Sequence, residues 1–318
     1  MPVEFLTNER AAAYGRFPPQ PERALLERWC FFDDADLELI GKRRGEHSRL
    51  GFGVQLATVR ATGMFLPDPV DVPAAVLDYV AGQLGIADPS VIKRYTERRT
   101  TRFEHQGEIA EVYGYVPFSE VEDELSCWVA DRAWPGGDGP TVLFDEAVAW
   151  LRQRQILLPG VSRLVRLVAR VREETIERLH TTLAAAVPAD RVAELLGVCE
   201  VEEPSRVSLL ERWRQGPRSE SGLTMVKALN RVSEIHGLGV SGLDLSGVPA
   251  RRVTELGRYG MAAKAPALRR RPCTRKVATL LATVRWLEAT AIDDVLEVFD
   301  QLMGAEFGRE GRAPVAGG

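Results

Sequence analysis

The chain has 318 residues, of which 45% are hydrophobic and 27% are charged, a composition typical of globular proteins that can bury a core. Its net charge of -4 is not that of a strongly basic nucleic-acid binder, so any DNA contact must come from local basic faces. The four cysteines include no CxxC pair, which argues against a disulfide framework or a zinc site. The sequence carries no secretion signal and no apolar run of membrane-spanning length, so the cytoplasm is the expected compartment.

The sequence predicts a first helical domain over residues 1–88. Asp33 is a suitable N-cap for a helix that ends at Gly45, and a second helix is expected over Glu46–Gly63. Apolar residues lie on nearly every face of this second helix, which predicts that it is buried at the centre of the domain. Another helix is expected to end at Gly85.

The sequence predicts a second helical domain over residues 89–158. Pro89 favours the start of a helix, and the basic segment KRYTERRTTRFEH follows before a helix that runs to Tyr113. Another helix is expected to end near Trp134, where the stretch PGGDGP is typical of a loop. A helix over residues 141–154 closes this domain.

The sequence predicts a helical region over residues 159–305, with longer packing helices that would serve as a linker or in dimerisation. Apolar side chains recur at helical spacing over residues 161–183 and 276–303, and a shorter helix is expected over residues 221–236. The tail, residues 306–318, is poor in apolar residues and is expected to be disordered. Since no stretch alternates as a strand does, the expected fold class is all-α, with successive small helical domains followed by longer helices.

The familiar signatures of catalysis are missing from the sequence. Gly237, Gly239 and Gly242 have the formal spacing GxGxxG, but that pattern binds dinucleotides only between a strand and a helix. Here it follows a predicted helix, which favours a helix end and a turn. The four histidines are scattered, and neither a nucleophile elbow nor a phosphate-binding loop occurs. We therefore expect no catalytic residue, metal or cofactor site.

The densest basic segment spans residues 93–105. If it is helical, Arg98, Arg102 and His105 share one face, because they lie at i, i+4 and i+7. Phe103 then falls on another face, which would pack in a core. A helix with a packed side and an opposite side of cations and hydroxyls can dock on DNA. The candidate DNA-binding residues of this segment are Lys93, Arg94, Arg98, Arg99, Thr101, Arg102 and His105.

A second basic cluster brackets the expected turn at Gly45. A short turn between two helices is the layout of helix-turn-helix modules, although the apolar second helix could reach DNA only through its N-terminal end. The alternative is a simple helical hairpin with a charged elbow. The candidate DNA-binding residues of this cluster are Lys42, Arg43, Arg44, His47 and Arg49.

Several segments, taken in order, carry a resemblance to a known family. They are FLTNERAAAYGRF, DDADLELIGKRRGEHSRLGFGVQLATVRATGMFLPDP, VPAAVLDYVAGQLGI, YTERRTTRFEHQGEIAEVYGY, VLFDEAVAWLRQRQILLPGVSRLVRLVARVRE and RKVATLLATVRWLEATAIDDVLEVFDQLM. In this order they resemble the N-terminal region of the Tn-three family of replicative transposases (TnpA). The resemblance runs from about Phe5 to Met303.

The resemblance implies a function on DNA. In that family the N-terminal region is helical and recognises the terminal inverted repeats of the transposon, which are double-stranded DNA. Catalysis belongs to an RNase-H-like domain far downstream, whose acidic triad binds magnesium. Because no segment here matches that domain, the resemblance implies a truncated product or a fragment, and no catalytic residue or magnesium site is carried over.

Two hypotheses of function remain from the sequence. The first is a DNA-binding module that recognises transposon ends, nucleoid-associated when bound and without catalytic activity of its own. The second is a helical dimerisation or regulatory protein, which forms a homodimer or a heterodimer with a full-length transposase and inhibits it. A hydrolase or nuclease is disfavoured, because no nucleophile, metal set or cofactor site is assembled.

Overall fold

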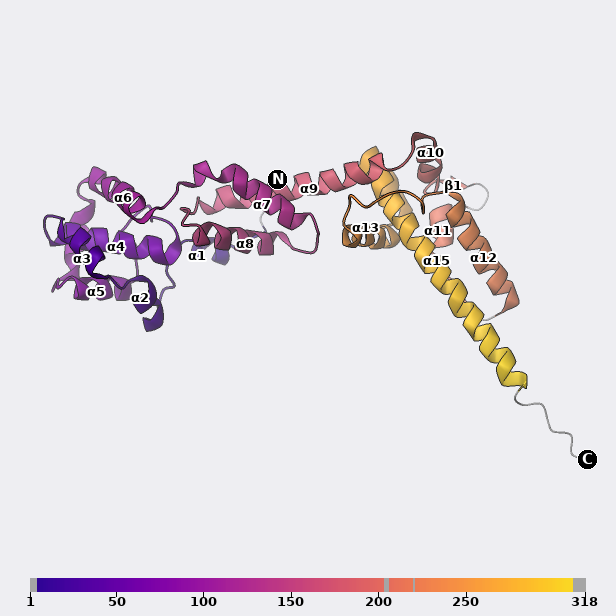
Figure 1. Cartoon of the computed structure of the whole chain (residues 1–318), viewed down its shortest axis with the longest axis horizontal. Coiled ribbons are helices and arrows are strands. Elements are labelled where there is room, and N and C mark those ends of the chain that lie inside the picture. Colours follow the sequence, from indigo (N-terminus) through magenta and orange to yellow (C-terminus); the bar gives the residue numbers. More distant parts are fainter. Residues whose placement is uncertain (1–4, 203–205, 220, 311–318) are drawn as a thin grey trace, which may run out of the picture. The chain divides into compact units, whose positions relative to one another are not determined.

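The computed structural model describes residues 5–202, 206–219 and 221–310, and their regular secondary structure is almost entirely helical (Figure 1). The strands in these ranges are β1 (Val201–Glu202) and β2 (Val207–Ser208), which pair antiparallel. The predicted all-α fold class is confirmed. None of the described helices combines the length and hydropathy that a membrane crossing requires.

The chain divides into two compact units. Unit 1 comprises Met1–Ala133 and Gly137–Arg172, and unit 2 comprises Trp134–Gly136 and Glu173–Gly318. The helices of unit 1 are α1 (Asn8–Ala13), α2 (Arg23–Trp29), α3 (Asp34–Gly41), α4 (Glu46–Thr62), α5 (Ala74–Gln83), η1 (Pro89–Thr96), α6 (Arg99–Tyr113), η2 (Phe118–Glu120), α7 (Glu122–Ala133), α8 (Pro140–Gln153) and the first half of α9 (Val161–Ala185).

Unit 2 receives the second half of α9 and the rest of the elements. Besides the two strands, these are α10 (Ala189–Gly197), α11 (Leu209–Trp213), α12 (Gly222–Gly237), α13 (Ala250–Ala262), α14 (Ala265–Arg269) and α15 (Cys273–Glu310).

Unit 1 contains two hydrophobic clusters. The first is built around α4 and extends from Phe17 to Ile109, so that η1 and the middle of α6 belong to it. The second extends from Phe118 to Val171 and joins η2, α7, α8 and the first half of α9. The structure therefore divides unit 1 differently from the predicted boundaries after residues 88 and 158, because apolar side chains on both sides of each boundary share one cluster.

The α4 helix is the central helix of the first cluster, as predicted. It begins after Gly45, whose φ of 81° suits a glycine, and ends at Gly63, whose φ is 83°. Every residue from Leu50 to Val59 is buried. Gly51 lies directly against the ring of Tyr95 from η1, so a larger residue there would displace that ring.

In unit 2, α12 and α13 pack on α15, the long yellow helix of Figure 1. Glycines on α13 allow a close approach to α15. A Cβ atom at Gly257 would lie 2.7 Å from the carbonyl oxygen of Ala282, and one at Gly260 would overlap the side chain of Thr283. The small residues of α13 thus let its backbone approach α15 closely.

Two predictions at the end of unit 2 can be compared with the structure. The GxGxxG pattern starts at Gly237, the last residue of α12, and Gly239 has a φ of 63°, so the expected helix end and turn are confirmed. The last helix is longer than predicted and ends at Glu310, so residues 306–310 are helical rather than a disordered tail. Residues 311–318 lie outside the described part of the chain.

Candidate nucleic-acid interface

The first predicted basic cluster lies at the junction of α3 and α4. Asp33 caps α3 through a reciprocal pair of hydrogen bonds with Asp36, and the turn over residues 42–45 leads directly into α4. Lys42 and Arg44 are exposed on this turn, and the ammonium of Lys42 lies 3.8 Å from Glu38 one turn back. The predicted layout of two helices joined by a short turn is present, and the buried α4 could approach DNA only with its first turn.

Arg43 differs from its neighbours, because its side chain turns inward. It forms an ion pair with Glu108 of α6, and its guanidinium lies 4.7 Å from the ring centre of Phe52. Only 17% of the side chain is exposed. Arg43 therefore ties the α3–α4 junction to α6, and phosphate contact would require it to leave this site.

His47 and Arg49 lie in the first turn of α4 and are half-buried. The ring of His47 lies beside Gly45, where a Cβ atom would be 3.1 Å from its Cε1. Arg49 forms no ion pair with another described residue. Both side chains therefore lie close to the N-terminus of α4.

The second predicted cluster does not form a single helix. The 3-10 helix η1 ends at Thr96, and α6 starts at Arg99. Arg98 is the N-cap of α6 with extended backbone (φ -100°, ψ 107°), so it lies outside the helical part. The prediction that Arg98, Arg102 and His105 share one helical face is therefore wrong, because the chain changes direction between η1 and α6.

His105 belongs to the core, which corrects its prediction as a DNA contact. It is 6% exposed, and its Nδ1 lies 2.8 Å from the hydroxyl of Tyr95. Its ring stacks on Tyr95 at 5.5 Å and meets Phe52 edge-on at 5.0 Å. Burial, assisted by the positive charge of Arg43, lowers the pKa of His105 to about 4, so the imidazole is neutral at pH 7.

Hydrogen bonds extend this buried site to α4. Burial raises the pKa of Tyr95, so its hydroxyl stays protonated and can donate to the neutral ring of His105. The side-chain amide of Gln55 in turn donates to the Tyr95 oxygen. Residues of α4, η1 and α6 thus hold one another in place. Sequence reasoning missed this role because it followed charge. The spacing of His105 and Ile109 at i, i+4 was the available signal for the buried face.

Arg102 and Phe103 also lie differently from the prediction. Arg102 is half-buried and donates a hydrogen bond of 2.8 Å to the carbonyl oxygen of Pro67. Phe103, predicted to pack in a core, is 52% exposed with the Arg102 guanidinium 4.6 Å from its ring centre. The reason is the rotation of α6, which directs His105 rather than Phe103 toward α4.

The remaining predicted residues reach the surface. Lys93, Arg94 and Arg98 are exposed, and Thr101 is half-buried. The side chain of Arg99 lies outside the described side chains. The structure therefore brings the two basic segments to one hydrophobic cluster, with Arg43, Arg102 and His105 turned inward as its supports. Exposed cations then project from the α3–α4 and η1–α6 junctions.

Magnesium, which the resemblance assigns to a separate RNase-H-like domain, finds no matching ligand set here. In the described residues, no group of three or more His, Cys, Asp or Glu side chains is arranged to hold a metal ion. The described residues therefore do not fit a magnesium site.

Comparison with known proteins finds several relatives that are transposases. The chain is 40% identical over 305 residues to the transposase for transposon gamma-delta of Escherichia coli, a match that covers 95% of this chain and 30% of that protein. It is 27% identical to the transposase for transposon Tn1546 of Enterococcus faecium, over 94% of this chain and 30% of the relative. A segment of 101 residues is 45% identical to the transposase for transposon Tn4556 of Streptomyces fradiae, covering 32% of this chain and 11% of the relative.

The predicted resemblance to transposases is thus confirmed, and the chain spans about 30% of the length of the first two relatives. A family described as "Domain of unknown function (DUF4158)" matches residues 5–171. This match covers more than half of the chain and nearly all of unit 1. The chain therefore belongs to the DUF4158 family and is a relative of the transposases of these transposons.

Proposed function

We propose that unit 1 binds double-stranded DNA at the terminal inverted repeats of a transposon, as part of a transposase. The observation that carries this proposal is the set of exposed guanidinium groups without an ion-pair partner among the described residues, at Arg44, Arg94 and Arg98. The planar guanidinium group matches the geometry of phosphate, so exposed arginines without an ion-pair partner are available for phosphate contacts.

The start of α6 adds a second source of positive potential. Its first turn contains no acidic residue, so the N-terminal end of the helix dipole is not neutralised. The first N–H groups of a helix lack intrahelical acceptors and bind phosphate readily. Arg98 is the N-cap residue at this end, and Thr101 lies in the first turn of α6. The end of α6 and the exposed arginines together suit contacts to the DNA backbone.

The relatives support the proposal that the ligand is DNA, because they are named as transposases. A transposase must recognise the ends of its transposon, and these ends are inverted repeats. The base-reading residues would then come from the α3–α4 turn and the first turn of α4, where Arg44 and Arg49 can reach a groove. Arginine is the commonest side chain in specific contacts to guanine.

Charge reversal tests the proposal. The double variant Arg94→Glu/Arg98→Glu is expected to weaken binding to a terminal-repeat duplex by at least roughly 100-fold, since each lost charge-assisted hydrogen bond costs about 1.5 to 3 kcal/mol. The matched control is Arg166→Glu/Arg170→Glu, which changes the net charge equally on the exposed side of α9. Fluorescence anisotropy with terminal-repeat and scrambled duplexes measures both affinity and preference. Equal affinity for the two duplexes would remove the claim of sequence recognition.

A second candidate function is dimerisation, with a second copy or with a full-length transposase. The observation that favours it is an apolar stripe on the last turns of α15. Ile292, Leu296, Phe299 and Met303 are between 39% and 56% exposed and repeat at intervals of four, three and four residues. This is the spacing of a coiled-coil seam. Light scattering after size-exclusion chromatography, with and without end DNA, tests it: a monomer under both conditions contradicts this candidate.

A further inference from the structure

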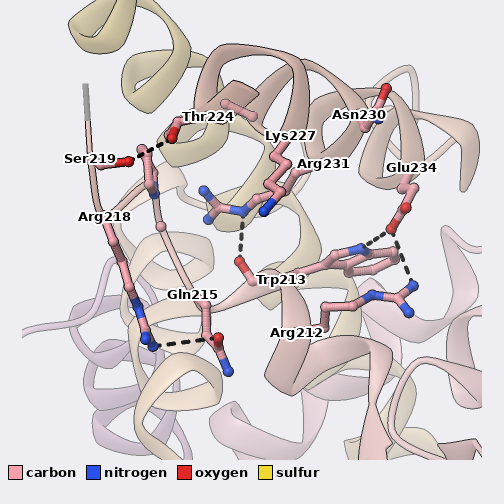
Figure 2. Close-up of a pocket in the computed structure, with 13 residues that line it drawn as sticks. Arg212, Trp213, Gln215, Arg218, Ser219, Thr224, Lys227, Asn230, Arg231 and Glu234 are labelled. Atoms are coloured by element: carbon pink, nitrogen blue, oxygen red, sulfur yellow. Dashed lines mark hydrogen bonds and ion pairs between the residues drawn. The ribbon is translucent and has the colours of Figure 1, made fainter. Parts of the chain in front are cut away.

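Unit 2 contains a cavity of about 530 Å3 beside α12, and several charged side chains line it (Figure 2). Its walls come from α11, from the loop that follows α11, and from one side of α12 between Thr224 and Glu234. Among the described residues, Arg212, Arg218, Lys227 and Arg231 line it, together with one carboxylate, that of Glu234. The cavity is therefore positively charged, and its lining favours an anion over an apolar ligand.

Two of these cations hold the cavity together. Arg231 is only 10% exposed, forms an ion pair with Asp294 of α15, and donates from its Nε to the carbonyl oxygen of Trp213 at 2.7 Å. Arg212 lies 3.3 Å from Glu234, which also accepts the indole N–H of Trp213 at 2.8 Å. Figure 2 shows that Trp213 contacts Arg231 through its carbonyl oxygen and Glu234 through its indole N–H. These residues fix the floor of the cavity.

The other two cations remain available. Lys227 is exposed and has no hydrogen bond or ion pair with any described residue. Arg218 is exposed and makes one long hydrogen bond, of 3.5 Å, to the side-chain oxygen of Gln215. In Figure 2, Arg218 runs along one side of the cavity and Lys227 projects into it from α12. A ligand with oxygen atoms of negative charge could bind both without displacing a carboxylate.

Hydroxyl groups complete the lining at the start of α12. The hydroxyls of Ser219 and Thr224 lie 2.8 Å apart, and Thr224 also lies 2.9 Å from the N-cap Ser221. The first turn of α12 contains no acidic residue, so the positive end of its dipole is open. Arginine, lysine, hydroxyls and a helix N-terminus are the groups that proteins use to hold DNA phosphates.

We propose that this cavity binds a phosphate group of the DNA backbone through Arg218 and Lys227, with the hydroxyls of Ser219 and Thr224 as further donors. The inference rests on the proposed function, because it presumes that the chain binds DNA. It adds a second contact in unit 2, which sequence reasoning did not single out because its cations are separated along the chain. Such a contact fixes the register of the protein on the duplex without reading bases.

The test compares full-length chains with matched charge changes in unit 2. Arg218→Gln/Lys227→Gln removes both available cations, and Lys264→Gln/Arg270→Gln removes two exposed cations that do not line the cavity. The cavity variant is expected to lose roughly tenfold in affinity for the end duplex. For this variant, the slope of the logarithm of the DNA-binding constant against the logarithm of the salt concentration is expected to become less steep by about 0.9, which is the contribution of one phosphate contact. The control variant is expected to keep the affinity and the salt dependence of the unaltered chain. Lys227→Arg is expected to retain most of the affinity.

Further arms separate the possible failures. If Arg218→Gln/Lys227→Gln binds like the control while Arg94→Glu/Arg98→Glu binds weakly, the cavity inference fails and the proposed function stands. If the unaltered chain does not bind duplex DNA, both fail. Calorimetric titration with inorganic phosphate and with a free deoxynucleotide checks the source of the anion. Tight binding of either one, lost in the cavity variant, would replace the DNA backbone by a small phosphate ligand. Unchanged thermal unfolding of each variant shows that folding is not the cause.

Discussion

Replacing His105 by glutamine tests the buried site that supports the basic surface. The imidazole is packed among Tyr95 and Phe52 and is 6% exposed. Its charged neighbours are Arg43 from the α3–α4 turn and Glu108 from its own helix. Glutamine can still accept a hydrogen bond from Tyr95, but it does not titrate. The substitution therefore removes the proton equilibrium of the site and keeps much of its polarity.

The magnitude follows from the pKa of His105, which burial lowers from 6.5 to about 4. A tenfold change in proton affinity equals about 1.4 kcal/mol, so full protonation costs the folded state roughly 3 kcal/mol. Between these two pH values the unfolded chain binds a proton that the folded chain does not. Stability from this group is fully present above pH 6.5 and is lost as the pH falls toward 4.

Hydrogen exchange of the α4 amides is a suitable assay, because α4 is buried against this site. Wild type and His105→Gln are compared at the same pH, so intrinsic exchange rates and the titration of other groups cancel. At pH 7 the variant is expected to be less protected, owing to its poorer packing. Between pH 6.5 and 5 the difference is expected to shrink by about 2 kcal/mol, because only the wild type has a histidine at this position that is protonated in the unfolded chain and neutral in the folded one.

The matched control is His180→Gln. His180 is a buried histidine of unit 2, and burial also lowers its pKa. This control is expected to leave the pH dependence of α4 protection unchanged. If His105→Gln and wild type lose protection in parallel from pH 7 to 5, His105 does not carry a buried proton equilibrium, and our assignment of it to the core would be refuted.

Two further predictions concern the packing of the two units. Gly260→Ala is expected to destabilise unit 2 by roughly 1 to 3 kcal/mol, because the added methyl overlaps Thr283 of α15. Gly237→Ala, where no atom lies within 4 Å, is the control, and thermal unfolding that is equal for both would contradict the close approach of α13. Asp36→Ala is expected to destabilise unit 1 by roughly 3 to 5 kcal/mol, since it leaves the partly buried guanidinium of Arg60 without its carboxylate at 2.7 Å. Chemical denaturation monitored in unit 1 measures this, and a loss below about 1 kcal/mol would show that water replaces the carboxylate.

Local patterns predicted the helices well but not the way in which they pack. The α4 helix was predicted with its ends and its burial, because two glycines bound a segment that is apolar on nearly every face. The boundary after residue 88 could not be predicted by such reasoning. Whether Ile92 joins the cluster of α4 depends on contacts between segments far apart in the chain, and periodicity within one helix contains no information on these contacts.

The basic segment over residues 93–105 shows a different limit. Counting positions assumes that one helix continues, and here η1 and α6 meet at an extended Arg98. Arg98 precedes α6 and departs from the count, whereas Arg102, Phe103 and His105 lie within α6 and keep their helical spacing. The count does not show which face of α6 packs on α4, and that face contains His105 rather than Phe103. Charge density located the segment, but the direction of each side chain depended on the rotation of α6.

The same structure explains how a chain of net charge -4 could bind DNA. At physiological ionic strength, charges act over roughly 8 Å, so a duplex responds to the nearest side chains and not to the total. Arg43 and Arg60 are partly buried and face carboxylates, and they contribute stability rather than surface potential. Arg94 and Arg98 are exposed and have no such partner among the described residues. Binding would then depend on a few unpaired arginines, and its salt dependence would report their number and not the net charge.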